Sequence, residues 1–318
     1  MKWKKLGRIF NPTEHKLANN CFEYAQSPQA LVFENFIRIY FSSRETDRKG
    51  KYLSHVSFID IDKNFKTIIN ISKDTVIKLG GLGCFDEHGI FPFNVLRVKD
   101  KVFGYTTGWN RKVSVSTDGS IGLAISEDNG VTFSKLGMGP ILTASLHEPF
   151  LVGDPFVKIM NGVFHMWYIC GVRWTNPEIG IEPDRVYKIM HATSNDGVKW
   201  VKEGRYLIAD KLNSDECQAL PTVIKLNETY HMFFCYRYAT DFRKNKMRGY
   251  RIGYSFSNDL IDWSRDDDQV GIDLSLAGWD SEMMCYPNVF ECDGKIYLLY
   301  NGNEFGKLGF GLAVLESI

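Results

Sequence analysis

The most constraining feature of this 318-residue chain is a proline that recurs at nearly even spacing within apolar segments. The prolines are Pro28, Pro92, Pro155, Pro221 and Pro287, and they lie 63 to 66 residues apart. Proline is tolerated at the first residue of a strand and is rare inside a central one. Each proline therefore predicts the first strand of a unit that occurs five times.

Three further strands are predicted after each proline strand. The second strands are rich in aromatic and β-branched residues, which favours strand over helix; they are expected at 36–41, 102–106, 163–169, 230–236 and 295–300. The third ends in a polar turn, and the fourth begins at an aromatic residue such as Trp200 or Trp263. Four antiparallel strands per repeat are typical of a propeller blade. The sequence predicts an all-β fold, a five-bladed β-propeller forming one domain over 1–318, with blades starting near residues 27, 91, 154, 220 and 286.

The last blade runs out of chain before its fourth strand. The N-terminal segment Trp3 to Ile9 resembles the fourth strand Trp200 to Tyr206, because both contain a tryptophan, a lysine, a glycine and an arginine in the same order. Residues 3–9 are therefore expected to complete the last blade and close the ring.

Composition narrows the functional classes. The formal net charge is zero, so the overall field favours neither nucleic acid nor an anionic membrane as a partner. The N-terminus lacks the apolar core of a secretion signal, and the chain has no apolar run long enough to span a bilayer, which predicts a cytoplasmic protein. Seven cysteines without a CxxC pair indicate buried thiols. No metal or other cofactor is predicted, since isolated histidines such as His88 and His147 are usually structural.

Acidic residues recur just before the prolines. A glutamate stands five residues earlier in four repeats, at Glu23, Glu87, Glu216 and Glu282, whereas in the third repeat Asp154 directly precedes Pro155. Asp86, His88 and His147 lie nearby in the sequence. Strand direction places all of these at one mouth of the ring, where converging carboxylates suit acid and base work on a glycosidic bond. The alternative is that they cap the inner strands through backbone hydrogen bonds.

The same mouth is expected to be basic and aromatic. Three second strands end on an arginine, at Arg44, Arg173 and Arg237, and the loops that follow are rich in lysine and arginine. Arginine binds phosphate or carboxylate through its planar fork, so these side chains predict an anionic ligand, with a solvated surface as the alternative. Trp109, Tyr238 and Tyr286 are candidates for stacking on a sugar ring.

These residues make the chain similar to the five-bladed propeller enzymes of glycoside hydrolase families 43, 32 and 68, and more distantly 130. Gly153-Asp154-Pro155 resembles the Asp-Pro element of those families, and Asp215-Glu216-Cys217 resembles the Glu-Cys element of family 32. The resemblance implies that Glu216 is the general acid and that Asp154 positions the sugar. By the same order along the chain it implies that Asp86 is the base or nucleophile.

Two positions depart from the family pattern. The first blade of those enzymes carries an aspartate just before its proline, whereas this chain has Ser27, which cannot act as base or nucleophile of that kind. In the third blade, Gly153 replaces the arginine of the family's Arg-Asp-Pro element. Either the constellation is displaced by one blade or the hydrolytic machinery is incomplete.

Three functions remain open on the sequence. The first is a glycoside hydrolase with Glu87, His88, His147 and Glu282 among its substrate-binding residues. The second is a phosphorylase or glycosyltransferase acting on a phosphorylated or nucleotide-linked sugar, and the third is a sugar-binding propeller without catalysis. In each case the expected partner is a small carbohydrate.

Overall fold

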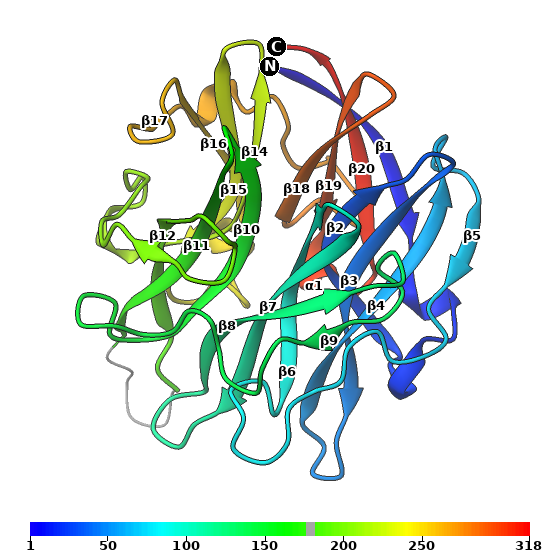
Figure 1. Cartoon of the computed structure of the whole chain (residues 1–318). Helices are drawn as coiled ribbons and strands as arrows, with labels where there is room; N and C mark the ends of the chain where they lie inside the picture. The colour runs from blue at the N-terminus through cyan, green and yellow to red at the C-terminus, as the bar shows by residue number, and fades with distance from the viewer. Residues whose placement is uncertain (176–181) are drawn as a thin grey trace.

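The computed structural model describes residues 1–175 and 182–318, and its strands form a β-propeller (Figure 1). They group into five blades of four antiparallel strands, and one parallel bridge between Ser54 and Gly89 joins the first two blades. From the inner to the outer strand, the blades are β2 (Glu23–Val32), β3 (Phe36–Thr46), β4 (Tyr52–Asp62) and β5 (Ile68–Ile71); β6 (Gly89–Val98), β7 (Lys101–Arg111), β8 (Thr117–Ser126) and β9 (Ser134–Lys135); β10 (Val152–Met160), β11 (Val163–Trp174), β12 (Arg185–Ser194) and β13 (Val201–Lys202); β14 (Glu216–Leu226), β15 (Thr229–Tyr238), β16 (Arg251–Ser257) and β17 (Ser264–Arg265); and β18 (Cys285–Cys292), β19 (Lys295–Asn301), β20 (Phe310–Ser317) and β1 (Lys2–Phe10).

Helical segments are short throughout the described residues. They are α1 (Asn303–Gly306) and the 3-10 turns η1 (Pro12–Glu14), η2 (Ala18–Asn20), η3 (Asn213–Asp215), η4 (Lys246–Arg248) and η5 (Asp267–Gln269). Within 1–175 and 182–318, no helix combines the length and the apolar character needed to cross a bilayer.

The repeated prolines lie inside the inner strands, which corrects the prediction that they begin them. At each one the pairing with the second strand shifts register, as between Gly153 and Phe156 in β10. The residue before the proline has a positive φ in four blades, 53° at Asp154 for example, and the Phe91–Pro92 bond is cis in the remaining blade. A bulge leaves its extra residue outside the hydrogen-bond ladder, so the missing N–H of proline removes no ladder bond there.

Side chains connect the inner strands around the axis. Gln29 Oε1 accepts hydrogen bonds from Asn94 Nδ2 at 2.9 Å and from Asn288 Nδ2 at 3.1 Å, which links blades one, two and five. Asn94 Oδ1 in turn accepts the N–H of Val157 in blade three at 3.0 Å. These buried amides satisfy one another and backbone groups, so they hold the inner strands of neighbouring blades together.

The hydrophobic core is divided among the five interfaces between neighbouring blades. Trp167 and Phe234, both fully buried, pack between blades three and four, and Phe10 and Leu312 belong to the cluster between blades five and one. Burying one large apolar side chain contributes about 1.5–3 kcal/mol. Each blade is therefore stabilised mainly by its two neighbours.

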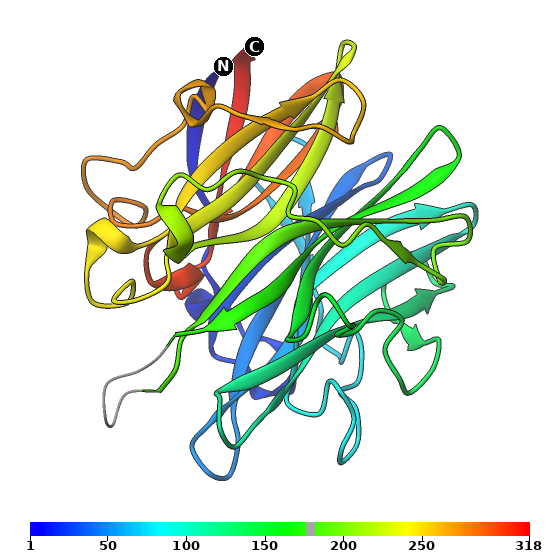
Figure 2. The same cartoon turned by 90° about the vertical axis from the view of Figure 1, so that its left-hand side faces the viewer.

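The N-terminal strand closes the ring, as the sequence predicts. β1 pairs antiparallel with β20 from Trp3 opposite Leu315 to Phe10 opposite Phe310. The two termini lie side by side in both views (Figures 1 and 2). Trp3 is 7% exposed and packs edge-on against Phe233 of blade four, with ring centroids 5.5 Å apart. β1 is nine residues long, whereas the outer strands β9, β13 and β17 have two residues each.

Candidate active site

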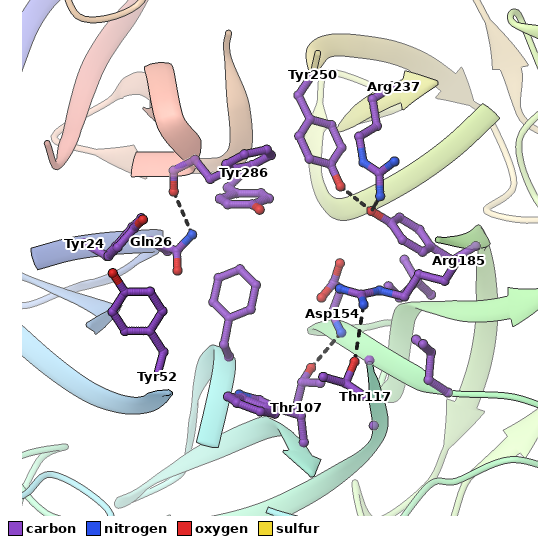
Figure 3. Close-up of a pocket in the computed structure, with 18 of the residues that line it drawn as sticks. Tyr24, Gln26, Tyr52, Thr107, Thr117, Asp154, Arg185, Arg237, Tyr250 and Tyr286 are labelled. Carbon is purple, nitrogen blue, oxygen red and sulfur yellow. Dashed lines mark hydrogen bonds between the residues drawn. The ribbon is translucent and has the colours of Figure 1, made fainter. Parts of the chain in front are cut away.

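A cavity of about 410 Å³ opens on the axis at the end of the ring where the inner strands begin (Figure 3). We call this cavity the axial pocket. Its wall is formed by the starts of first and third strands and the ends of second strands. It therefore lies at the mouth of the ring that strand direction predicts. Nine of its lining side chains are aromatic and four are arginines, against two carboxylates, Asp118 and Asp154. The pocket is therefore apolar in its walls and cationic in its charged groups.

Asp154 is the buried acid of this pocket. Its side chain is held at the bulge of β10, with φ at 53° and 8% of the residue exposed. Its backbone N–H donates to Thr107 Oγ1 at 2.7 Å, and its Oδ2 accepts the N–H of Leu220 at 3.3 Å. Burial raises the pKa of Asp154 to about 7, although the Leu220 N–H and the charge of Arg185 both act to lower it. The carboxyl group therefore keeps its proton to a higher pH than an ordinary aspartate does.

Thr107 explains why residue 153 is glycine rather than arginine. A Cβ at Gly153 would lie 2.7 Å from Thr107 Cγ2, closer than real side-chain contacts allow. The same threonine supplies the acceptor for the Asp154 N–H. A cation still reaches the acid from another strand, because Arg185 at the start of β12 is near enough to lower the pKa of Asp154. Its Nη1 donates to Thr117 Oγ1 at 3.3 Å (Figure 3).

Glu216 lies outside the lining of the axial pocket. It is the first residue of β14, is fully buried, and pairs with Arg265 of β17, with Oε1 2.6 Å from Nη1. Its other oxygen accepts the N–H groups of Lys211 and Leu212 at 2.8 and 2.9 Å. Each carboxylate oxygen thus has protein donors, an arrangement that favours a structural role over proton transfer to a ligand.

Asp86 also lies outside the pocket lining. It is 1% exposed and forms an ion pair with Lys135 of β9. A Cβ at Gly80 would collide with the carboxylate of Asp86 and one at Gly108 would collide with its Cβ, so the backbone is packed closely around this side chain. Of the three residues expected to converge, Asp154 is therefore the one that the described residues place in the pocket wall, and the catalytic roles of Asp86 and Glu216 stay predictions.

The other candidate residues divide into two groups. Arg44, Arg237, Trp109 and Tyr286 line the pocket. The remaining candidates do not line the pocket. Glu87 Oε2 accepts the Gly83 N–H at 2.9 Å, His88 stacks on Trp109, and His147 is exposed. Arg173 pairs with Asp215 at 2.5 Å, Tyr238 contacts Arg248, and Glu282 pairs with Lys246.

The expected basic loop from Arg173 to Lys188 includes 176–181, which lie outside the described residues. Among the residues that are described, no group of three or more His, Cys, Asp or Glu side chains has an arrangement suited to a metal ion.

Sequence reasoning missed several residues of the pocket wall. Thr107, Asp118, Tyr187 and Tyr250 line it, and the last two have paired hydroxyl groups, with Tyr187 Oη also accepting from Arg237 Nη2 at 2.9 Å (Figure 3). Most of them lie at or near the start of a third strand. The predicted strand directions already put these starts at the mouth, so that position in each repeat was the available signal.

The chain is 33% identical over 323 residues to the uncharacterized protein Rv1502 of Mycobacterium tuberculosis H37Rv, and equally to the uncharacterized protein MT1551 of strain CDC 1551, with both chains of each pair covered completely. No family model matches the sequence.

Solved structures share the fold. A putative glycoside hydrolase from Parabacteroides distasonis superposes with a TM-score of 0.71 at 12% identity, covering 99% of this chain and 97% of the other. A β-1,2-mannobiose phosphorylase from Listeria innocua gives 0.69 at 11% identity, covering 99% and 96%. A thermostable family 43 glycoside hydrolase gives 0.63 at 15% identity, covering 94% and 92%. The expected resemblance to the propeller glycosidases is thus confirmed for the fold.

Proposed function

This chain belongs to the same family as the two mycobacterial proteins, and we propose that it is a carbohydrate-active enzyme that cleaves a glycosidic bond in the axial pocket. The observation that supports this proposal most directly is the burial of the Asp154 carboxyl group in the wall of the axial pocket, where it accepts one long hydrogen bond from Leu220. A general acid must hold its proton near neutral pH, which an ordinary aspartate does not do. Burial raises the pKa of Asp154 to about 7, and the side chain lies in the wall of a cavity.

In this mechanism Asp154 protonates the glycosidic oxygen as the bond to the sugar breaks. Aromatic residues such as Trp109 and Tyr286 offer flat surfaces on which the sugar rings stack. A second hollow of about 400 Å³ shares Thr117, Asp118 and Leu151 with the axial pocket. It provides room for the part of the substrate on the other side of the bond.

Hydrolysis also needs a group that activates water. Asp118 is the second carboxylate of the pocket wall, and we assign it this role. Its side chain is 41% exposed, and its Oδ2 lies 3.1 Å from Lys112 Nζ, so it faces solvent and stays close to a cation. One partly solvated aspartate near a cation and one buried aspartate with a raised pKa line the same pocket, and acid and base catalysis requires two carboxyl groups in such different surroundings.

The test separates acid catalysis from binding by means of the leaving group. Wild type and Asp154→Asn are compared on alkyl glycosides and disaccharides, and on the matching 2,4-dinitrophenyl glycosides, whose leaving group needs no proton. Loss of turnover on the former with turnover kept on the latter supports the proposal. Equal turnover by the two proteins, or no cleavage of any member by folded wild type, contradicts it. The same assay on Asp86→Asn and Glu216→Gln tests the roles that the family resemblance implies for those residues.

Phosphorolysis, or transfer to another acceptor, is the second candidate function. It is favoured by the cationic wall, because a phosphate dianion is itself the nucleophile and needs no carboxylate base, only a general acid such as Asp154. Cleavage that depends on inorganic phosphate and releases a sugar phosphate would replace hydrolysis as the assignment. Turnover that is unaffected by phosphate would exclude it.

A further inference from the structure

The axial pocket carries more positive than negative charge. Four arginines line it, Arg44, Arg185, Arg237 and Arg243, of which Arg243 pairs with Asp184, whereas the lining contains two aspartates, Asp118 and Asp154. Low-dielectric walls strengthen the field of such charges. The pocket is therefore electrostatically suited to an anion even though the whole chain has a formal net charge of zero.

Arg237 is the most unusual of these cations. The residue is 3% exposed, and it forms no ion pair within the described part of the chain. Its Nη1 donates to the carbonyl oxygens of Tyr238 and Ala239 at 2.7 and 3.3 Å, and its Nη2 donates to Tyr187 Oη. Its Nε is buried and has no hydrogen-bond partner among the described residues.

Two other buried arginines of the same chain show what is missing at Arg237. Arg38 is 5% exposed and forms two hydrogen bonds to Asp60, at 2.7 and 2.8 Å. Arg265, whose side chain is 7% exposed, pairs with Glu216 and Asp267. Both lie away from the pocket lining, and both are neutralised by carboxylates. A buried cation without such a partner is costly, so the counter-charge of Arg237 is expected from outside the described residues.

Aromatic rings around Arg237 compensate this cost only in part. Its guanidinium carbon lies 3.4 Å from the centroid of Phe242, a cation–π contact. Such contacts are weaker than a desolvated ion pair. The ring also covers one face of the guanidinium, which restricts the approach of an anion to the remaining edge and to the side facing the cavity.

Neighbouring groups supply further donors. The hydroxyl groups of Tyr187 and Tyr250 are hydrogen-bonded to each other, which uses one of their two hydrogens. Tyr187 Oη also accepts from Arg237 Nη2. The other hydroxyl hydrogen of the pair is therefore left to donate. Burial raises the pKa of Tyr187 to about 12, which keeps this donor neutral and protonated. Arg185, on the same side of the cavity, donates to Ser116 and Thr117 at 3.2 and 3.3 Å and forms no ion pair among the described residues (Figure 3).

We propose that the axial pocket binds an oxyanion, a phosphate or carboxylate group, against Arg237, with Arg185 and the Tyr187–Tyr250 pair as further donors. The group is either a free ion or an acidic substituent of the sugar. This proposal deepens the proposed function by giving the substrate or co-substrate a negative charge beside the acid Asp154. It is nevertheless tested by binding alone.

The test measures thermal unfolding and calorimetric binding at constant ionic strength. The probes are inorganic phosphate, glucose 1-phosphate, glucose 6-phosphate and glucuronate. Chloride is the salt control, and glucose is the control without an acidic substituent. Wild type is compared with Arg237→Met and with Arg111→Met, a control that removes a cation of the same mouth which is already paired with Asp47 at 2.8 Å. We expect an anion to stabilise wild type and Arg111→Met, and its Kd to rise about tenfold or more in Arg237→Met.

Each outcome shows either whether the pocket binds an oxyanion or whether that oxyanion is a free ion or part of a sugar. Binding of inorganic phosphate supports a free oxyanion, whereas binding of a sugar phosphate or glucuronate without binding of inorganic phosphate supports an acidic sugar. No anion-specific binding by wild type, or equal binding by Arg237→Met, overturns the site. If Arg237→Met does not fold, Arg185→Gln takes its place. Asp154→Asn is expected to keep anion binding while losing turnover, so failure of the proposed cleavage and failure of this site are distinguishable.

Discussion

Asp154 and Glu216 are two buried acids on the inner strands of adjacent blades, and they differ in almost everything except burial. Glu216 receives donors at both oxygens, from Arg265, Gln218 and the backbone of 211–212. Asp154 receives one long hydrogen bond, from Leu220, and lies in the wall of a cavity. The protein therefore neutralises Glu216 with its own donors, whereas it leaves Asp154 available to a ligand.

This difference shows that the type of residue and its place in the repeat do not define its chemistry. A carboxylate with four donors stabilises a fold and has no lone pair left for a substrate. A carboxyl group in an apolar pocket with few donors is destabilising when charged, and this is what raises its pKa toward neutrality. The same acid-to-amide substitution should therefore have opposite consequences at the two positions.

The largest expected effect is on turnover at Asp154. Asp154→Asn removes the transferable proton, and we expect kcat/KM on alkyl glycosides to fall about 10²- to 10⁴-fold, the usual contribution of general acid catalysis. Steady-state kinetics on the best substrate of the screen measures this. Glu216→Gln, assayed on its folded fraction, should keep most of the activity. A comparable loss in both variants would remove the distinction drawn between the two acids.

The second effect is on stability at Glu216. Glu216→Gln places an amide NH₂ against the donors of Arg265 or of the 211–212 backbone, and breaking a buried ion pair in this way costs about 3–5 kcal/mol. Urea unfolding measures the change in the free energy of unfolding. Arg265 keeps Asp267 as a partner, which favours the lower end of that range. An unchanged unfolding midpoint would show that Glu216 is not structural.

A third effect of opposite sign is expected on stability at Asp154. Its pKa is raised in the folded state, so the folded protein binds this proton more tightly than the unfolded chain does. The resulting stability is fully present below about pH 4 and is lost as the pH rises through about 7. Asp154→Asn has no such loss, so it should unfold like wild type at pH 4 and be more stable at pH 8, by up to about 4 kcal/mol. A variant less stable than wild type at pH 8 would contradict this.

The smallest effect concerns the pH dependence of activity. Activity that needs protonated Asp154 should fall as the pH rises above about 7, the pKa of the acid. Arg185 lowers that pKa, so Arg185→Gln should move the basic limb of the kcat/KM profile to higher pH, by on the order of one unit or less. The shift is independent of any change in the maximal rate. Arg265→Gln, on the Glu216 side, should leave the limb where it is, and a shift to lower pH in Arg185→Gln would rule out this coupling.

Much of the fold could be predicted because a propeller repeats its local pattern. The spacing of Pro28, Pro92, Pro155, Pro221 and Pro287 gave five inner strands, and the likeness of 3–9 to 200–206 gave the closing strand, which the pairing of β1 with β20 confirms. The prolines themselves lie within the strands, because the bulges that accommodate them depend on register with the second strand.

The site was less predictable because distance from the proline gives the height of a residue along the axis and not the direction of its side chain. Glu216 and Asp154 are both near the mouth, but strand alternation and the bulge before Pro155 direct them into different surroundings. Thr107 and Arg185 belong to other strands, so their effect on Asp154 depends on contacts across blades.

The sequence by itself determined the number of blades, the order of the strands, the closure of the ring and the presence of acids and arginines at one mouth, since these follow from local periodicity and chain direction. Only the tertiary structure decided which acid is neutralised and which is left in the cavity, and which buried arginine lacks a carboxylate partner among the described residues. Those outcomes depend on burial and on partners far apart in the sequence, such as Arg265 for Glu216 and Leu220 for Asp154. Burial and partners together set the cost of a charge, and that cost separates a structural carboxylate from a reactive one.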